Sequence, residues 1–594
     1  MSMLVQTAAP DPSAGRTVEQ GEGQKYSPSS QLPLVVSAAK KRAAEPLLVV
    51  LFAVRNLIGQ LPLLFPVDPK LLPSPKLKYR SHYRYWGPSF REGLEKSQRA
   101  NLSEFEVALY LIDFSSLERL LAQYYRPSHK GQVPFHPVSL FLCVCLRREL
   151  DYSWRRLAKL LANKEQGAGW RKLFGFEEGE TPSASGLRYF FKSVGAKTFS
   201  ELCPLFIDLL RQNSLLPEHS TYPGDGEERG ITITQDGMLH PALSRPSCLL
   251  ATNDCYQPLA DEQMRGETVS EEKPEEGASQ EAIEAKRQCR AQEKGQTGCN
   301  CDTAECQQRC RRASNLDPEA RFIHYEGNNK QKDEGKKVDN GKGINIFGYR
   351  SLADRILNDR LAVAWTALSD LYSANTDERT VFVERLRRLR ERFPDLKIGE
   401  CLYDAAVGYE PCLEAIWKLG ALRMVDIRAD ESDKNFEGCV SRGYDGEGCP
   451  LCPHGYRLTS NGYDFEHRRR KWVCGGVCRR KPRRKGEAVA AVTDCPYLDR
   501  ERKLGYIVNV GKSLPNGNMR LARDIPYGSP RWKARYGRRN LSESRNGQME
   551  GLGLKRMKSY GLERDNKELQ IGDFLLNLRT LGRLVVQATD LSEN

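Results

Sequence analysis

Three acidic residues, far apart in the chain, have the type and context that divalent-metal chemistry requires. Asp236 ends the alternating run 231–236, and Asp404 follows the largely apolar run 398–403. Both runs predict β-strands that deliver a carboxylate at their C-terminal end. Glu543 lies in an arginine-rich segment that predicts the first turns of a helix. Hard divalent cations prefer oxygen ligands, and two such ions can hold the attacking and leaving oxygens of a phosphoryl transfer.

The surroundings of these acids carry more information than the acids themselves, since the chain has 77 acidic residues. The sequence resembles the insertion-sequence transposases that have an RNase H-like DDE catalytic domain. Asp236 matches the first acid of that family, and Asp404, in Leu-Tyr-Asp-Ala-Ala-Val-Gly-Tyr, matches the second. Tyr536, Arg539 and Glu543 match the family's tyrosine, arginine and catalytic glutamate at spacings of three and four residues.

The resemblance covers roughly residues 100–590 and departs from the family pattern at one position. The family has a lysine seven residues after its glutamate, and this chain has Glu550 there. Lys555, Arg556 and Lys558 follow shortly afterwards. Which basic residue grips DNA at this point stays open, and Lys555 is one candidate.

The resemblance implies a DNA transposase that binds the ends of its insertion sequence, cleaves them by metal-dependent hydrolysis and joins the 3′-OH ends to target DNA. Asp236, Asp404 and Glu543 would bind two Mg²⁺ (or Mn²⁺) ions. Arg539 would hold a phosphate, and Tyr536 would help to position the DNA end. Reaction at two ends implies a homodimer or a larger synaptic complex, associated with the nucleoid of a prokaryotic cytoplasm. The alternatives are a domesticated DNA-binding protein without cleavage activity and a junction nuclease of the same fold.

The composition agrees with a nucleic-acid partner and reduced cysteines. The 594 residues carry a net charge of +14, from 91 basic and 77 acidic residues. This surplus favours nucleic-acid binding, although a solvated surface is the alternative. Residues 1–45 lack the order of a secretory signal, and Arg55 follows the apolar run 46–54 too closely for a membrane span. Clustered cysteines among the 18 in the chain therefore indicate metal before disulfide.

One cysteine cluster has the spacing of a zinc ribbon. Cys449 and Cys452 form a Cys-x2-Cys pair, Cys474 and Cys478 form a Cys-x3-Cys pair, and 21 residues separate the two pairs. These four thiols predict one structural Zn²⁺ site. A second group, within residues 299–310, has no standard spacing, so zinc and a flexible insertion with incidental thiols both stay open.

Basic residues surround the predicted zinc ribbon. The run Arg468, Arg469, Arg470 and Lys471 lies between the two cysteine pairs, and further cations occupy residues 479–485. So many cations beside a small zinc module predict a surface that follows DNA phosphates.

These residues require a layered fold to position them. We expect an α/β RNase H-like catalytic core over residues 223–594, with a Cys-rich insertion at 245–315 and a zinc-ribbon-like insertion at 430–500. An all-helical DNA-binding and dimerisation domain at 76–222 precedes it, and 1–75 is a flexible, inessential extension. The order of strands and helices in the core is that of helices packed on a sheet.

Periodicity predicts the main elements. In the helical domain we expect helices over 104–125, 138–150, 154–162, 185–193 and 199–213. The helices at 154–162 and 185–193 form either a helix-turn-helix or part of a plain bundle. The aromatic run 79–86 either clamps DNA or packs on its own rings. In the core we expect strands at 231–236, 317–323, 343–349, 361–368, 398–403, 422–427 and 505–510, and helices at 376–393, 409–419 and 573–586.

Overall fold

The computed structural model of the protein describes a set of ranges that all lie within one compact unit, Val49–Asn594. The described residues are 63–67, 78–87, 101–125, 132–244, 314, 316–325, 331–333, 336–338, 344–427, 449–475, 505–514 and 519–591. Most of the predicted insertion at 245–315, and much of that at 430–500, therefore lies outside the described residues.

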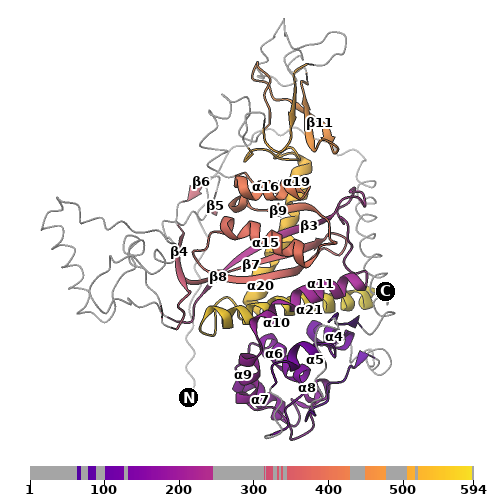
Figure 1. Ribbon diagram of the computed structural model, residues 1–594, viewed down its shortest axis with the longest axis vertical. Helices are drawn as coiled ribbons and strands as arrows, with labels where there is room; N and C mark the ends of the chain where they lie inside the picture. Colours follow the sequence, from indigo (N-terminus) through magenta and orange to yellow (C-terminus); the bar gives the residue numbers. More distant parts are fainter. Residues whose placement is uncertain are drawn as a thin grey trace, which may run out of the picture. The chain divides into compact units, whose positions relative to one another are not determined.

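A mixed β-sheet forms the centre of the described structure (Figure 1). Its strands are β3 (Ile231–Pro241), β4 (Arg321–Tyr325), β7 (Ile344–Asn358), β8 (Val363–Ser373), β9 (Ile398–Tyr403) and β10 (Leu422–Val425). β7 pairs antiparallel with β3, β4 and β8, whereas β9 pairs parallel with β3, and β10 pairs parallel with β9. The path β8-β7-β3-β9-β10 thus has an antiparallel half followed by a parallel half.

Helices cover both faces of this sheet. Neighbouring residues of a strand point to opposite faces, and Asp354 and Arg355 of β7 show which helix lies where. Asp354 forms an ion pair with Arg385 of α15 (Glu378–Arg392), at 2.6 Å. Arg355 donates instead to the Ser542 carbonyl of α20 (Asn540–Gly551), at 2.9 Å. α15 and α20 therefore lie on opposite faces of the sheet.

The N-terminal part of the chain is largely helical. It contains α4 (Glu104–Leu111), α5 (Leu117–Ala122), α6 (Pro137–Glu149), α7 (Trp154–Ala162), α8 (Ala168–Phe174), α9 (Ala184–Ser193), α10 (Ala196–Ser200) and α11 (Leu202–Gln212). Ser183 caps α9, because its side chain accepts a hydrogen bond from the Gly186 amide at 3.1 Å. The single helix predicted over 104–125 is wrong, because a two-residue strand separates α4 from α5.

The C-terminal helix joins the helical block to the sheet. α21 (Leu562–Leu591) packs on β8 and on α4, α6, α10 and α11. Figure 1 shows it beside α11, between the sheet and the helices α4 and α6. Phe574 of α21 contacts the rings of Phe65, Phe141 and Phe206. The predicted boundary at residue 222 therefore does not separate two hydrophobic cores. The prediction of the helix start at 573 missed the first turns of α21, whose charged residues hide the apolar periodicity.

A short strand within the predicted N-terminal extension 1–75 packs on the fold. β1 (Leu63–Leu64) pairs with β2 (Ile112–Asp113), the strand that separates α4 from α5. Leu63 and Phe65 are buried in the main core. The sequence did not predict this strand, because two residues are too few to show a periodicity and the surrounding composition is rich in proline.

Leu63→Ala is expected to lower the free energy of unfolding by about 2–5 kcal/mol, since it leaves a cavity in the core. Leu64, the next residue, is the matched control, because it is 55% exposed. Leu64→Ala should change the free energy of unfolding by less than about 0.5 kcal/mol. Urea unfolding of the full chain measures both. Equal stabilities of the two variants would contradict the placement of β1 in the core.

The aromatic segment 79–86 packs on the helical block. Tyr79 lies edge-on to His136, at 4.7 Å between ring centroids, and the hydroxyl of Tyr83 accepts from the Phe114 amide at 3.0 Å. Arg80 lies over the ring of Phe135, at 4.1 Å. Of the two readings of this segment, the structure therefore favours packing within the protein.

A second, three-stranded sheet lies in the region of the predicted zinc ribbon. It consists of β11 (Thr459–Asp464), β12 (Arg469–Val473) and β13 (Ile507–Val510), all antiparallel. The prediction that the segment 505–510 returns to the main sheet is therefore wrong: its pairing partner is β12. Two further short strands, β5 (Gln331–Asp333) and β6 (Lys336–Val338), pair with each other.

Candidate active site

The register between β3 and β9 brings Asp236 and Asp404 together. The parallel pairing aligns Thr234 with Leu402, so two residues further on Asp236 and Asp404 occupy equivalent positions. The sequence predicted that Asp236 ends its strand, and this is wrong. β3 continues to Pro241, because β7 goes on pairing with it after β9 has stopped. Asp404 does end its strand, and its side chain accepts from the Ala406 amide at 2.9 Å.

Glu543 reaches the same place from α20. The preceding α19 (Pro530–Tyr536) and the 3-10 turn η3 (Gly537–Arg539) lead directly into α20. Arg539 contacts Glu543 at 3.0 Å and Asp404 at 3.5 Å. Burial lowers the pKa of Arg539, but Tyr536, Asp404, Glu543 and Asp236 outweigh this effect and raise it. One guanidinium thus contacts two of the three predicted acids, and the third, Asp236, contributes to its raised pKa.

Two buried arginines hold α20 against the sheet. Arg545 of α20 binds Asp573 of α21 through two contacts, at 2.6 and 2.7 Å, and neither side chain is exposed. Arg355 of β7 donates to the carbonyl of Ser542 on the turn that carries Glu543. The burial of Arg355 lowers its pKa to about 10. These contacts set the distance between Glu543 and the strands.

Asp236 is a buried carboxylate with one oxygen left open. Its side chain is 6% exposed, and Asn546 of α20 lies 3.4 Å from its Oδ1 atom. Its Oδ2 atom is buried with no hydrogen-bond partner in the described part of the chain. Burial raises the pKa of the Asp236 carboxyl. The charges of Arg545, Arg355 and Arg539 lower this pKa, and the charge of Glu543 raises it. Such an oxygen suits a cationic ligand, which would replace the lost hydration.

A fourth carboxylate, Glu378, lies at this site and was missed in the sequence. It is the first residue of α15 and forms an ion pair with Arg350 of β7 at 2.9 Å. A Cβ atom on Gly237 would lie 3.3 Å from the Glu378 carboxylate, so this group borders β3 beside Asp236. Burial raises the pKa of Glu378, Asp404 and Asp236 raise it further, and Arg350 opposes them. The signal available in the sequence was an acid at a helix start directly after a core strand.

A buried ionic network supports the opposite end of the same strands. Glu400 of β9 is fully buried and accepts from Arg535 of α19 at 2.9 Å, and it also contacts Arg538. Arg535 binds Asp225 as well, at 2.7 Å. The basic segment before Tyr536 therefore includes arginines that build the fold, which composition alone cannot distinguish from DNA-binding ones.

The remaining predicted residues near the site have mixed placements. Tyr536 stacks on Trp532, at 4.4 Å between ring centroids and 13° between planes, so its ring is held in the fold. Burial raises the pKa of its hydroxyl. Lys555 is exposed and pairs with Glu550 at 2.8 Å. Lys555 is thus available at the surface, beyond the end of α20.

The carboxylate oxygens of Asp236, Asp404 and Glu543 are the type of ligand that divalent cations prefer. One of these three carboxylates has a buried oxygen without a partner among the described residues. Within the described ranges, no three His, Cys, Asp or Glu side chains are close enough together to hold a metal ion. Arg539 contacts both Asp404 and Glu543, at 3.5 and 3.0 Å.

Three of the four predicted zinc ligands contribute to one small hydrophobic cluster. Cys449 is buried in it, and Cys452 and Cys474 pack against it beside Trp472. A tight turn follows Cys452, whose carbonyl accepts from the Gly455 amide at 2.8 Å. Cys478 lies outside the described residues. The three described cysteines do not by themselves form a metal-binding group, so the zinc assignment depends on their shared cluster and on the spacing.

We expect purified protein to contain one zinc per chain, and the double variant Cys449→Ser with Cys452→Ser to lose it. Elemental analysis gives the stoichiometry. Cys412→Ser is the control, because Cys412 is buried in the main core, away from the cluster, and that variant should retain its zinc. An unchanged zinc content in the double variant would exclude these residues as ligands.

The basic run beside the cluster is only partly available to DNA. Arg470 is 6% exposed, and its guanidinium donates to the Asp524 carbonyl and, at 2.8 Å, to Ser460. Arg468 lies over the ring of Trp417 at 4.1 Å, and Arg469 pairs with Asp464 at 3.2 Å. Lys471 is half-buried on β12. The predicted phosphate contact of Arg470 is therefore replaced by a structural role, because its charge is bound within the fold.

Comparisons with known proteins identify no relative of this chain: no protein-family model, curated protein or solved structure matches it. None of the helices in the described ranges is both long enough and apolar enough to cross a membrane.

Proposed function

We propose that the protein is a DDE transposase, which cleaves the ends of its insertion sequence and joins their 3′-OH groups to target DNA. The observation that carries the proposal is the position of Arg539, which contacts Asp404 at 3.5 Å and Glu543 at 3.0 Å. The register between β3 and β9 places Asp236 level with Asp404. A chance match gives no reason for acids from two distant stretches of the chain to contact the arginine of the same motif.

The fold supports this proposal at a coarser level. Three antiparallel strands followed by two parallel ones, with helices on both faces, form an arrangement suited to an RNase H-like core. The carboxylates lie where β3 and β9 separate, and the helix that carries Glu543 lies on one face of the sheet there.

The side chains have distinct roles in this proposal. Mg²⁺ ions held by Asp236, Asp404 and Glu543 would supply Lewis-acid stabilisation of the attacking and leaving oxygens. Asn546 orients Asp236 so that one carboxylate oxygen stays open. Arg539 presents a planar guanidinium that can exchange its carboxylate partners for a phosphate oxygen of the DNA. Glu378 adds negative charge at the same edge and is held there by Arg350.

The test uses a labelled duplex made from the DNA that flanks the coding region. We expect Mg²⁺-dependent nicking at one position, followed by products in which the 3′ end is joined to a second duplex. Nicking without joining would indicate a nuclease of the same fold. Binding without nicking would indicate a DNA-binding protein that does not cut. Either result would overturn the transposase proposal.

A further inference from the structure

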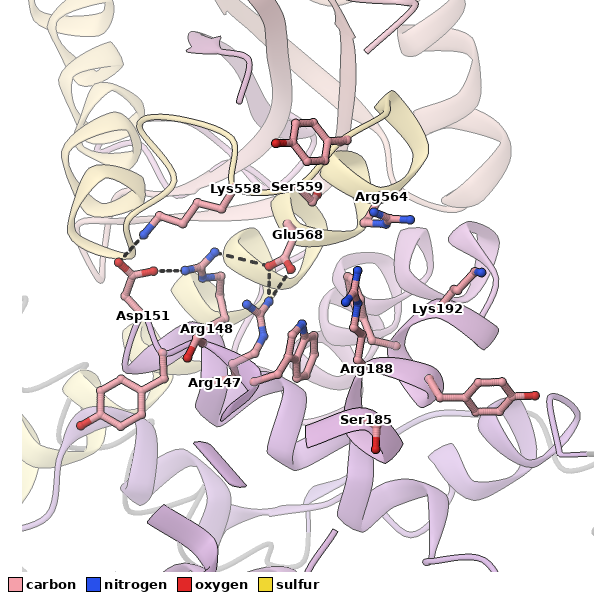
Figure 2. A pocket seen from close by; sticks show the side chains of 16 residues that line it. Arg147, Arg148, Asp151, Ser185, Arg188, Lys192, Lys558, Ser559, Arg564 and Glu568 are labelled. Atoms are coloured by element: carbon pink, nitrogen blue, oxygen red, sulfur yellow. Dashed lines mark hydrogen bonds and ion pairs between the residues drawn. The ribbon is translucent and has the colours of Figure 1, made fainter. Parts of the chain in front are cut away.

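A groove of about 780 Å³ separates the helical block from the segment that leads into α21. Its walls come from the end of α6, the start of α7, one side of α9 and residues 558–568. The site carboxylates Asp236, Asp404 and Glu543 do not line it. Figure 2 shows the labelled side chains that converge on it from these elements.

The floor of the groove is a buried ionic network. Arg147 and Arg148 both contact Glu568, and the Arg148–Glu568 distance is 3.4 Å. Asp151 links Arg148 to Lys558 (Figure 2). Both arginines are more than nine-tenths buried, and their Nε atoms have no hydrogen-bond partner in the described part of the chain. The floor thus holds three basic and two acidic side chains, which leaves an excess of one positive charge.

Three further cations lie on the walls without a carboxylate partner. Arg188 and Lys192 are exposed on α9, one helical turn apart, and Arg564 lies across the groove on α21. No ion pair joins any of the three to an acidic residue in the ranges that the structure describes, and Figure 2 shows none. The lining as a whole has six basic and two acidic side chains, an excess of four positive charges.

Aromatic rings flank these cations. Tyr189 is 66% exposed next to Arg188, and Tyr560 is 40% exposed on the opposite wall. Aromatic residues exposed to this degree are uncommon, and the described part of the chain has few of them. Unpaired cations interleaved with exposed rings suit a chain of phosphates joined to sugars and bases.

We propose that this groove binds the sugar–phosphate backbone of DNA, at a place distinct from the carboxylate site. Arg188, Lys192 and Arg564 contact successive phosphates, the buried pair Arg147 and Arg148 supplies a positive floor, and Tyr189 packs against sugar or base. The groove adds affinity for DNA but not sequence preference, because its cations converge into a concave surface instead of projecting toward base edges. This inference rests on the proposed function for its choice of DNA as the polyanion.

The test compares the parent chain with a triple variant, Arg188→Gln, Lys192→Gln and Arg564→Gln. The probes are an element-end duplex and a scrambled duplex of the same length, and the readout is Kd as a function of salt. We expect weaker binding to both duplexes, by the same factor. The slope of log K against log salt should become shallower by up to about 2.7, or about 0.9 for each lost phosphate contact. Tyr189→Ala should weaken binding without changing this slope.

The matched control removes the same charge elsewhere, through Lys164→Gln, Arg387→Gln and Arg390→Gln, all of which are exposed and do not line the groove. Its salt slope should stay close to that of the parent. An equal loss in the control would show a general charge effect and overturn the inference. A loss confined to the element-end duplex would show base reading and overturn it as well.

A nicking assay at saturating DNA separates this inference from the proposed function. The groove variant should nick at the parent rate once the DNA is bound, since the carboxylate site is intact. If the parent binds DNA through the groove but never nicks, the proposed function fails while the groove assignment stands. If the parent nicks and the triple variant binds like the parent, the groove assignment alone fails.

Discussion

Asp236→Asn, Asp404→Asn and Glu543→Gln are each expected to lower Mg²⁺-dependent strand cleavage by a factor on the order of 10³ or more, because residues that hold metal ions together act as one unit. Each substitution keeps the shape of the side chain and removes the charge that attracts the cation. DNA binding should persist, because basic side chains, and not these carboxylates, would contact the phosphates. The measurement is single-turnover nicking of a labelled end duplex, alongside Kd for the same duplex.

Glu550→Gln is the control for this prediction. Glu550 lies on the same helix as Glu543, seven residues further on, which is about 10 Å along the axis. It pairs with the exposed Lys555. The variant should nick at close to the parent rate. If Glu550→Gln is inactive while Glu543→Gln is active, both the family alignment and the assignment of the third acid are wrong.

Arg545→Met is expected to lower the free energy of unfolding by about 3–5 kcal/mol, because it leaves the carboxylate of Asp573 buried without its main partner. Both side chains of the pair are fully buried. Methionine fills most of the space, so the loss comes from the uncompensated charge and not from a cavity. Because Arg545 also lowers the pKa of Asp236, the variant should weaken cleavage even under conditions in which it is folded.

Lys555→Met provides the comparison for a surface pair. Lys555 and Glu550 are 70% and 44% exposed, and such a pair contributes only about 0–1 kcal/mol. Urea unfolding of both variants at one pH measures the difference. Similar losses in Arg545→Met and Lys555→Met would show that the Arg545–Asp573 pair does not hold α20 on the core.

Local sequence patterns predicted the elements that carry the candidate catalytic acids. The alternating run before Asp236 and the apolar run before Asp404 became β3 and β9, and the segment with Arg539 and Glu543 became helical. Spacings of three and four residues place side chains on one helical face, so the contact between Arg539 and Glu543 was available from the sequence. The hydrophobic period of a segment and the spacing of its side chains are local properties, so the sequence alone determines them.

Tertiary structure alone decided how these elements meet. The alignment of Asp236 with Asp404 depends on the β3–β9 register, and a shift of one residue would turn one carboxylate to the other face. Glu378 joined the site through the packing of α15, because an acid at a helix start does not by itself determine where that helix packs. In composition, an arginine in a buried ion pair looks the same as one that binds DNA. Only the long-range contacts of the folded chain distinguish the two kinds. Arg470 and Arg545 are bound within the fold, whereas Arg188 and Arg564 line the groove.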